Sequence, residues 1–216
     1  MSNNYDPIAR YYDSLSRLVF GRSEIDAQVG MLPFVQAGSR VLIVGGGTGW
    51  ILEELAALHP AGLRIVYVES SGKMMALSKA RGCGENVVEF VQLPVEQFVT
   101  EDRYDCILTG FVFDNFSATG AGYVFRLLDG LLCDGGRWLF ADFCLQRGVV
   151  KFWQTLMLKT MYGLARLICG VDARQLPDTD PLFAAAGYRP LQRAYYYARF
   201  IKAIVYEKAG VSPALT

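Results

Sequence analysis

A glycine-rich segment between a predicted strand and a predicted helix is the feature of this sequence best suited to binding a ligand. Residues 45–49 read Gly-Gly-Gly-Thr-Gly. They follow the apolar run at 41–45, which is typical of a buried strand, and they lead into a helix expected at 49–58. Glycines at such a junction let backbone N–H groups approach a ligand at the N-terminus of the helix. The placement therefore predicts a ligand-binding loop.

The spacing of these glycines separates two classes of ligand. Dinucleotide-binding loops have the pattern G-x-G-x-x-G, in which the third glycine allows close packing of helix against strand. Here that third position is Trp50, and the chain has G-x-G-x-G instead, at Gly45, Gly47 and Gly49. Glu69 ends a second predicted strand at 64–69, where a carboxylate can accept the ribose hydroxyls of a nucleoside in either class. The loop therefore favours a nucleoside ligand other than a dinucleotide.

With this spacing the sequence resembles the class I S-adenosylmethionine-dependent methyltransferases of the small-molecule type, similar to those acting on ubiquinone and menaquinone. The segment 69–75, Glu-Ser-Ser-Gly-Lys-Met-Met, looks like the family's D-x-S-x-x-M-L with Glu for Asp. The segment 131–143 resembles the family's approach to its fifth strand, and 5–13 looks like the start of methyltransferases acting on quinones and other lipophilic rings. Motifs support the resemblance over 5–145, and architecture supports it beyond.

The resemblance implies S-adenosylmethionine as cofactor, with the glycine loop near its methionine portion, Glu69 on the ribose and Met74 against the adenine. The implied cofactor-binding set is Gly45, Gly46, Gly47, Gly49, Glu69, Ser70, Met74, Gln92, Leu93 and Gly110. One position departs from the family pattern, because Leu93 stands where many members carry an Asp that bonds the adenine amino group. Gln92 or Glu96 then substitutes for that acid, or backbone and packing alone hold the adenine.

Candidates for contact with the methyl acceptor follow from the same resemblance and from the expected sheet. Methyl transfer is an in-line displacement on an activated cofactor, so positioning and desolvation can supply much of the acceleration. Tyr12 would face the cofactor or the acceptor, unless its helix is a plain packing helix. If a hydroxyl acceptor needs a base, that base should lie where the strands at 104–110 and 136–143 end. The candidates are Asp114 and Asn115 after the first of these strands and Asp142 at the end of the second. Asp114 could instead cap a helix, and Asp142 could hold a loop.

The elements that must position these residues alternate in a pattern typical of an α/β fold. Strands are expected at 41–45, 64–69, 86–92, 104–110 and 136–143, with helices at 49–58, 71–82 and about 120–132 between them. The runs at 188–197 and 199–207 are too close together for a helical crossover and should form an antiparallel hairpin. The expectation is a doubly wound, mostly parallel seven-stranded sheet with that hairpin at one edge.

The remaining segments predict covering helices around one domain spanning 1–216. A helix capped by Asp6, with Pro7 at its first position and Gly21 at its end, and a second helix over 23–34 form an N-terminal cover at 1–38. The cofactor-binding core is expected at 39–146, a helical insertion at 147–187 with a short helix at 180–186, and the terminal hairpin at 188–207. Cys133 to Gly136 is expected to turn into the fifth strand.

Composition excludes several function classes. The chain has 216 residues, 21 basic and 21 acidic side chains, and a single His. A net charge of +0 argues against a nucleic-acid binder, and one His leaves no multi-His metal site. The lone His59 should end a helix away from the active site. With five cysteines that form no close pair and no leader-like start, a cytoplasmic location is expected.

The apolar segment 149–170 has competing interpretations. Its Lys and Arg residues interrupt any run long enough to span a membrane. The segment is either an insertion helix packed on the domain or a lid over an apolar acceptor pocket. That pocket would include Phe111, Phe113, Phe116, Trp153 and the tyrosines at 195–197. Its one-sided basic residues also permit peripheral contact with an anionic membrane or with an acidic group of the substrate.

The sequence thus predicts methyl transfer from S-adenosylmethionine to the oxygen or carbon of a small aromatic or lipophilic acceptor. Two alternatives stay open: an NAD(P)-dependent oxidoreductase, and a non-catalytic nucleoside-binding or partner protein on the same fold. The acceptor and the oligomeric state are not fixed by the sequence.

Overall fold

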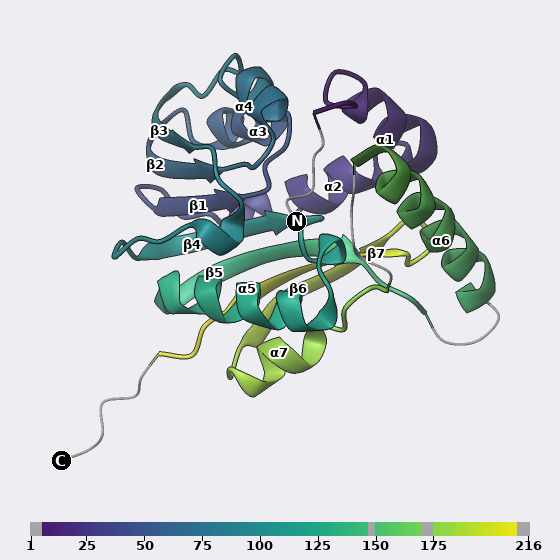
Figure 1. Ribbon diagram of the computed structural model, residues 1–216. Coiled ribbons are helices and arrows are strands. Elements are labelled where there is room, and N and C mark those ends of the chain that lie inside the picture. The colour runs from purple at the N-terminus through teal and green to yellow at the C-terminus, as the bar shows by residue number, and fades with distance from the viewer. Residues whose placement is uncertain (1–5, 147–149, 170–174, 211–216) are drawn as a thin grey trace.

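A seven-stranded sheet forms the centre of the molecule in the computed structural model, which describes residues 6–146, 150–169 and 175–210 (Figure 1). The strand order is β3-β2-β1-β4-β5-β7-β6. The strands are β1 Arg40–Val44, β2 Ala61–Val68, β3 Glu85–Val91, β4 Tyr104–Gly110, β5 Leu132–Phe143, β6 Arg189–Tyr196 and β7 Ile201–Glu207. The first five pair in parallel, and β7 is antiparallel to both β5 and β6. The expected doubly wound sheet with an antiparallel hairpin is confirmed.

Helices cover both faces of this sheet. They are α1 Tyr12–Phe20, α2 Ser23–Val29, α3 Trp50–Leu58, α4 Gly72–Ser78, α5 Ala118–Leu131, α6 Val150–Cys169 and α7 Asp180–Ala185, with short 3-10 turns η1 Leu32–Phe34, η2 Val95–Gln97 and η3 Phe113–Asn115. One core cluster joins residues of α2, α3 and α6 to one face of the sheet. A second cluster joins α5 and α7 to the other face, where Phe125 stacks on Trp138 at 5.3 Å between ring centroids. The central strands are therefore apolar on both faces.

The N-terminal segment differs from its sequence prediction. The first helix begins at Tyr12 rather than at Pro7, and residues 6–11 form turns. Asp6 does not cap that helix, because its carboxylate accepts hydrogen bonds from the Ser71 hydroxyl at 2.5 Å and from the Lys73 N–H at 3.1 Å. These contacts fix the segment to the start of α4 and hold the backbone out of the helix.

Several other boundaries differ as well. The helix predicted over 23–34 ends at Val29 and is followed by η1, and the helix predicted over 71–82 ends at Ser78. The fifth strand begins at Leu132, which pairs with Tyr104 before the register shifts. Residues 133–136, predicted as a turn before this strand, therefore lie within it, where its pairing with β4 shifts register.

No helix within the described ranges combines the length and apolar character needed to cross a bilayer. Likewise, in the part of the chain that the structure describes, no group of three His, Cys, Asp or Glu side chains is placed to hold a metal ion.

Candidate active site

A cavity of about 530 Å³ opens at the carboxyl ends of four neighbouring strands. Its floor includes the last residues of β1, β2, β4 and β5, namely Val44, Val68, Gly110 and Phe143. Residues of α1, α2 and α6 also line it, so that these helices cover the edge of the sheet (Figure 1). This is the edge at which open α/β sheets bind their ligands.

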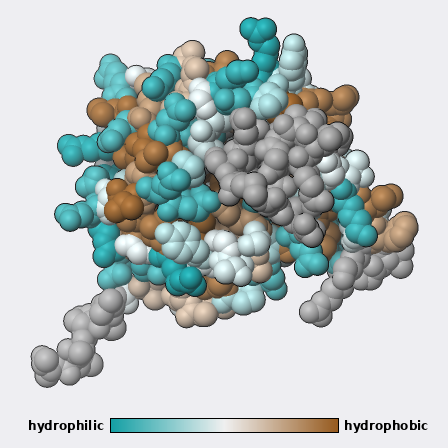
Figure 2. All heavy atoms as spheres, viewed as in Figure 1, coloured by the Kyte–Doolittle hydropathy of each residue, from teal (hydrophilic) through white to brown (hydrophobic). Residues whose placement is uncertain are grey.

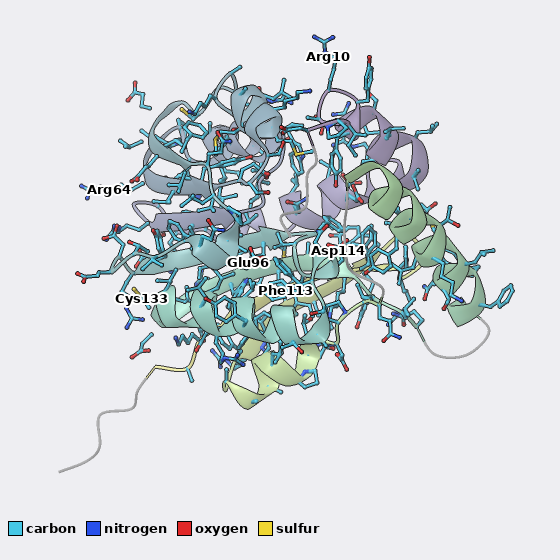
Figure 3. The ribbon with its side chains drawn as sticks, viewed as in Figure 1. Arg10, Arg64, Glu96, Phe113, Asp114 and Cys133 are labelled. Atoms are coloured by element: carbon cyan, nitrogen blue, oxygen red, sulfur yellow. The ribbon has the colours of Figure 1, made fainter. Side chains whose placement is uncertain are left out.

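The structure brings most of the residues predicted from the sequence to this cavity and leaves three outside its walls. Those that line it are Tyr12, Gly45, Gly46, Gly47, Glu69, Ser70, Met74, Leu93, Gly110 and Asp114. Gly49, Gln92 and Asp142 are not among its lining residues. Figure 3 shows Asp114 near the centre of the molecule. Cys133 lies at the start of β5, at the other edge of the sheet. His59 contacts the Val35 carbonyl oxygen through Nε2 at 3.1 Å and does not line the cavity.

The glycine loop presents its backbone to the cavity. A Cβ built on Gly46 would overlap the ring of Tyr67, whose hydroxyl donates to the Gly47 carbonyl oxygen at 3.0 Å. Gly47 has φ +62°, and a Cβ there would meet only the sulfur of Met74, at 3.9 Å. The loop therefore rests on Tyr67 on one side, and at Gly47 it leaves open the space that a side chain would fill.

Glu69 lies beside this loop with its carboxylate almost fully buried. One oxygen accepts the Gly47 N–H at 3.0 Å, and the other accepts the Ser71 N–H at 2.8 Å. Burial raises the pKa of Glu69, and these N–H donors oppose that rise. Because a carboxylate has about four acceptor positions, it can still accept hydroxyl groups from a ligand in the cavity.

The N-terminal segment is hydrogen-bonded to the glycine loop and to the start of α4. The Thr48 hydroxyl donates to the Asp13 carboxylate at 3.0 and 2.9 Å, and Arg81 pairs with Asp13 at 3.5 Å. The contacts of Asp6 with the start of α4 hold the other end of the segment. The start of α1 is thereby fixed over the cavity.

Thr48→Val should loosen α1 without changing the shape of the loop. The change removes the hydroxyl that donates to Asp13, and a hydrogen bond of this kind contributes about 0.5–1.5 kcal/mol. We expect amide hydrogen exchange in α1 to become about 3- to 10-fold faster. Exchange measured by mass spectrometry tests this, with Thr119→Val on the exposed start of α5 as the control. Unchanged exchange in α1 would show that Asp13 holds the helix by other contacts.

Much of the remaining wall of the cavity is apolar. It includes Phe20, Phe111, Phe116, Phe143 and Met161. The aromatic pocket predicted from the sequence is therefore formed only in part, since Phe113 is buried in the core and Trp153 packs on Phe200 with 5.8 Å between ring centroids.

Helix α6 both packs on the domain and lines the cavity, so the two interpretations of 149–170 are not exclusive. Leu158 and Tyr162 are buried in the core, and Met161 and Tyr162 reach the cavity. Of the predicted basic face, residue 147 lies outside the described ranges, and at 151 and 166 the structure describes only the helix and not the side chains.

Asp114 and Asp142 form a buried pair. The Asp114 N–H donates to Asp142 Oδ2 at 3.2 Å, and the Phe143 N–H donates to Asp142 Oδ1 at 2.7 Å. Burial raises the pKa of both carboxyl groups, and the charge of Asp142 raises the pKa of Asp114 further. Asp142 holds the backbone behind the cavity, whereas Asp114 reaches the cavity wall.

Glu24 is a cavity residue that the sequence analysis missed. It lies in the first turn of α2, and its carboxylate accepts a hydrogen bond from the Ser16 hydroxyl of α1. Burial raises the pKa of Glu24 to about 7. In the sequence it stands in a run of charged and polar residues, typical of a solvated helix face, and no spacing rule marks it.

The site fits a nucleoside that carries a short polar chain. Gly47 leaves space beside the loop, Glu69 supplies a buried carboxylate for hydroxyl groups, and Met74 offers an apolar wall. Trp50 occupies the position of the third glycine of a dinucleotide loop and itself lines the cavity. A methyltransferase domain model matches residues 42–140, which hold the glycine loop, Glu69 and the end of β4. The protein is an S-adenosylmethionine-dependent methyltransferase similar to those of class I.

Known proteins similar to this methyltransferase include both sequence relatives and structures. The ubiquinone/menaquinone biosynthesis C-methyltransferase UbiE of Geotalea daltonii is 28% identical over 81% of this chain and 77% of its own length. A Haloferax volcanii methyltransferase solved with the Trm112 activator has a TM-score of 0.69 at 14% identity, covering 97% of this chain and 99% of its own. The Burkholderia thailandensis 1,6-didemethyltoxoflavin-N1-methyltransferase has a TM-score of 0.64 at 16% identity, covering 94% and 85%. The two structures show the shared fold.

Proposed function

We propose that this methyltransferase acts in the cytoplasm on a lipophilic aromatic ring that carries a hydroxyl group, such as a hydroquinone. The observation that carries the proposal is that one continuous cavity is lined by the glycine loop and Glu69 and also by Phe20, Phe111 and Phe143. Similarity to a quinone C-methyltransferase supports the same class of acceptor and methylation at a ring carbon.

The cofactor end of the cavity would be held by this chain's loops. Gly45, Gly46 and Gly47 would face the methionine portion, Glu69 would accept the ribose hydroxyls, and Met74 would pack against the adenine. Leu93 lines the wall where an acid is common in the family, so packing would hold the adenine there, with Glu96 also within the lining. When bound, S-adenosylmethionine supplies an activated methyl group. Tyr12, on the covering helix, would close the cavity over it.

At the acceptor end the protein would orient the ring and exclude water. The phenylalanine walls favour an apolar ring by burial of its surface. Burial and the charge of the neighbouring Asp142 raise the pKa of Asp114 well above its ordinary value. In its protonated form, this carboxyl group would donate a hydrogen bond to an oxygen of the ring. Positioning and desolvation are then the main contributions of the chain to the reaction.

Exposed apolar residues on two of the helices that line the cavity support a lipophilic acceptor reached from a membrane surface. Leu18 of α1 is 82% exposed, and Phe152 of α6 is 78% exposed. Hydrophobic residues also appear on the surface where α1 lies (Figure 2). The segment 149–170 would then make weak peripheral contact with the bilayer.

Labelled cofactor and an acceptor panel test the proposal. We expect methyl transfer to benzo- and naphthohydroquinones, and none to their dimethoxy counterparts or to fatty acids, because only the hydroquinones place a hydroxyl in an apolar pocket. Anionic vesicles should increase the rate with long-tailed acceptors only. Calorimetry should show micromolar binding of S-adenosylhomocysteine and no binding of NADH. Transfer to fatty acids alone would contradict the proposed acceptor class, and NADH binding would favour an oxidoreductase.

A further inference from the structure

Glu24 lines the cavity from α2, which covers the edge of the sheet, rather than from the sheet itself. Its carboxylate is partly buried and accepts a hydrogen bond from Ser16 of α1. The other ionisable side chains that line the cavity are Tyr12, Asp13 and Arg17 of α1, Glu69 after β2, Glu96 of η2, Asp114 of η3 and Tyr162 of α6. The charge of Glu24 also raises the pKa of Asp114, after burial and the charge of Asp142.

The other ionisable groups near the acceptor are poorly suited to accept a proton. Burial and the charge of Asp142 raise the pKa of Asp114 well above its ordinary value, which disfavours its carboxylate form, and its Oδ1 already accepts a hydrogen bond from Asn115 at 2.9 Å. Asp142 lies behind the wall. The Tyr162 hydroxyl donates to the Asp114 carbonyl oxygen at 3.1 Å, and burial raises its pKa. Among the described residues that line the cavity there is no His.

We infer that Glu24, held by the Ser16 hydroxyl, is the base that accepts the proton of the acceptor's hydroxyl group. The inference rests on the proposed function, because it requires a hydroxylated acceptor. In this step the O–H bond of the acceptor breaks, the proton passes to a carboxylate oxygen of Glu24, and the electron pair stays on the acceptor oxygen. The ring becomes more nucleophilic as a result. After product release, the proton passes from Glu24 to water.

The acidity of Glu24 suits this role near neutral pH. Burial is the main cause of its raised pKa, Asp13 adds to the rise, and the Ser16 hydroxyl opposes it. A base works best when its pKa lies near the working pH. With a pKa of about 7, Glu24 is ionised above that pH and loses its basic form below it. The rate should therefore rise as the pH increases through 7 and then level off.

The same group should make the stability of the ligand-free protein depend on pH in the opposite sense. The pKa is raised from an ordinary value of 4.5 to about 7 in the folded protein, so between these values the folded state binds more protons than the unfolded state. Stability from this group is thus complete below about pH 4.5 and is lost as the pH rises through 7.

Glu24→Gln tests the inference, with Asp26→Asn as the matched control on the exposed side of the same helix. The Gln variant should lower kcat for hydroquinones by about 10²- to 10³-fold and remove the rise through pH 7. Its affinity for S-adenosylhomocysteine should stay within about twofold, and its Tm between pH 5 and 8 should fall less than that of the unmodified protein. Ser16→Ala should shift the midpoint of the rate profile to higher pH. Asp26→Asn should change none of these.

The outcomes separate this inference from the proposed function. If the unmodified protein methylates hydroquinones and the Gln variant keeps its kcat and pH profile, the base is not Glu24. If the Gln variant loses S-adenosylhomocysteine binding in proportion to kcat, Glu24 supports the cofactor and the inference is wrong. If the unmodified protein binds S-adenosylhomocysteine yet methylates no hydroxylated ring, the proposed acceptor class fails, and the inference fails with it.

Discussion

Gly49→Ala is expected to lower the free energy of unfolding by about 2–4 kcal/mol, as judged from core overpacking together with a strained backbone. Gly49 begins α3 at φ +82°, a conformation that costs an L-residue about 1 kcal/mol. A Cβ at this position would also lie 2.5 Å from Ser78 Cβ and 2.6 Å from Ser78 Cα. Because the second atom belongs to the backbone of α4, the two helices must move apart.

Urea unfolding of Gly49→Ala and Gly62→Ala separates the two contributions. Gly62 has φ +92°, and a Cβ there would meet nothing within 4 Å. The control should therefore lose only the backbone contribution of about 1 kcal/mol. Gly49→Ala should in addition bind S-adenosylhomocysteine at least tenfold more weakly, because α3 carries the glycine loop. Equal losses of stability in the two variants would show that the contact with α4 is relaxed at no cost.

Glu69→Ala is expected to weaken binding of S-adenosylhomocysteine by tenfold or more. Charge-assisted hydrogen bonds to a ribose are worth about 1.5–3 kcal/mol. The structure adds a second reason, since the same carboxylate accepts the N–H groups of Gly47 and Ser71 and so holds the glycine loop against the start of α4. Calorimetry measures the affinity directly.

Two further variants make the Glu69 measurement specific. Glu69→Gln keeps the size of the side chain and one acceptor oxygen, and it should lose less affinity than the Ala variant. Glu89→Ala, on the exposed side of β3, should bind with unchanged affinity. If Glu69→Ala also binds with unchanged affinity, the ribose site lies elsewhere.

The strands could be predicted well because their signal is local. Short, mainly apolar runs such as 41–45 and 104–110 are typical of strands, and the structure forms strands there within one residue of the predicted bounds. The helix ends were predicted less well because tertiary contacts decide them. Asp6 has the right type and place to cap its own helix, yet it is bound by Ser71 and Lys73 from a segment more than 60 residues away.

The residues of the candidate site also differ in whether a local motif or a tertiary contact decides their position. The glycine loop and Glu69 belong to a motif with fixed spacing, so the sequence placed them at one edge of the sheet. Glu24 has no such spacing, because its role depends on how α2 turns beneath α1. Asp142 stands at the carboxyl end of a strand, where ligand-binding residues are expected. Its carboxylate instead accepts two backbone N–H groups, and Asp114 is the residue of the pair that lines the cavity.

The position of β7 between β5 and β6 has a consequence for synthesis of the chain. The five parallel strands can pair once residue 143 has been made, but β6 must wait for β7, which follows it in the sequence and is its partner in the described sheet. Until β7 pairs with Phe143 and its neighbours, the hydrogen-bonding edge of β5 stays open. Open, apolar strand edges favour association with other chains. The nascent chain is therefore most prone to aggregate in the interval before its C-terminal strand arrives.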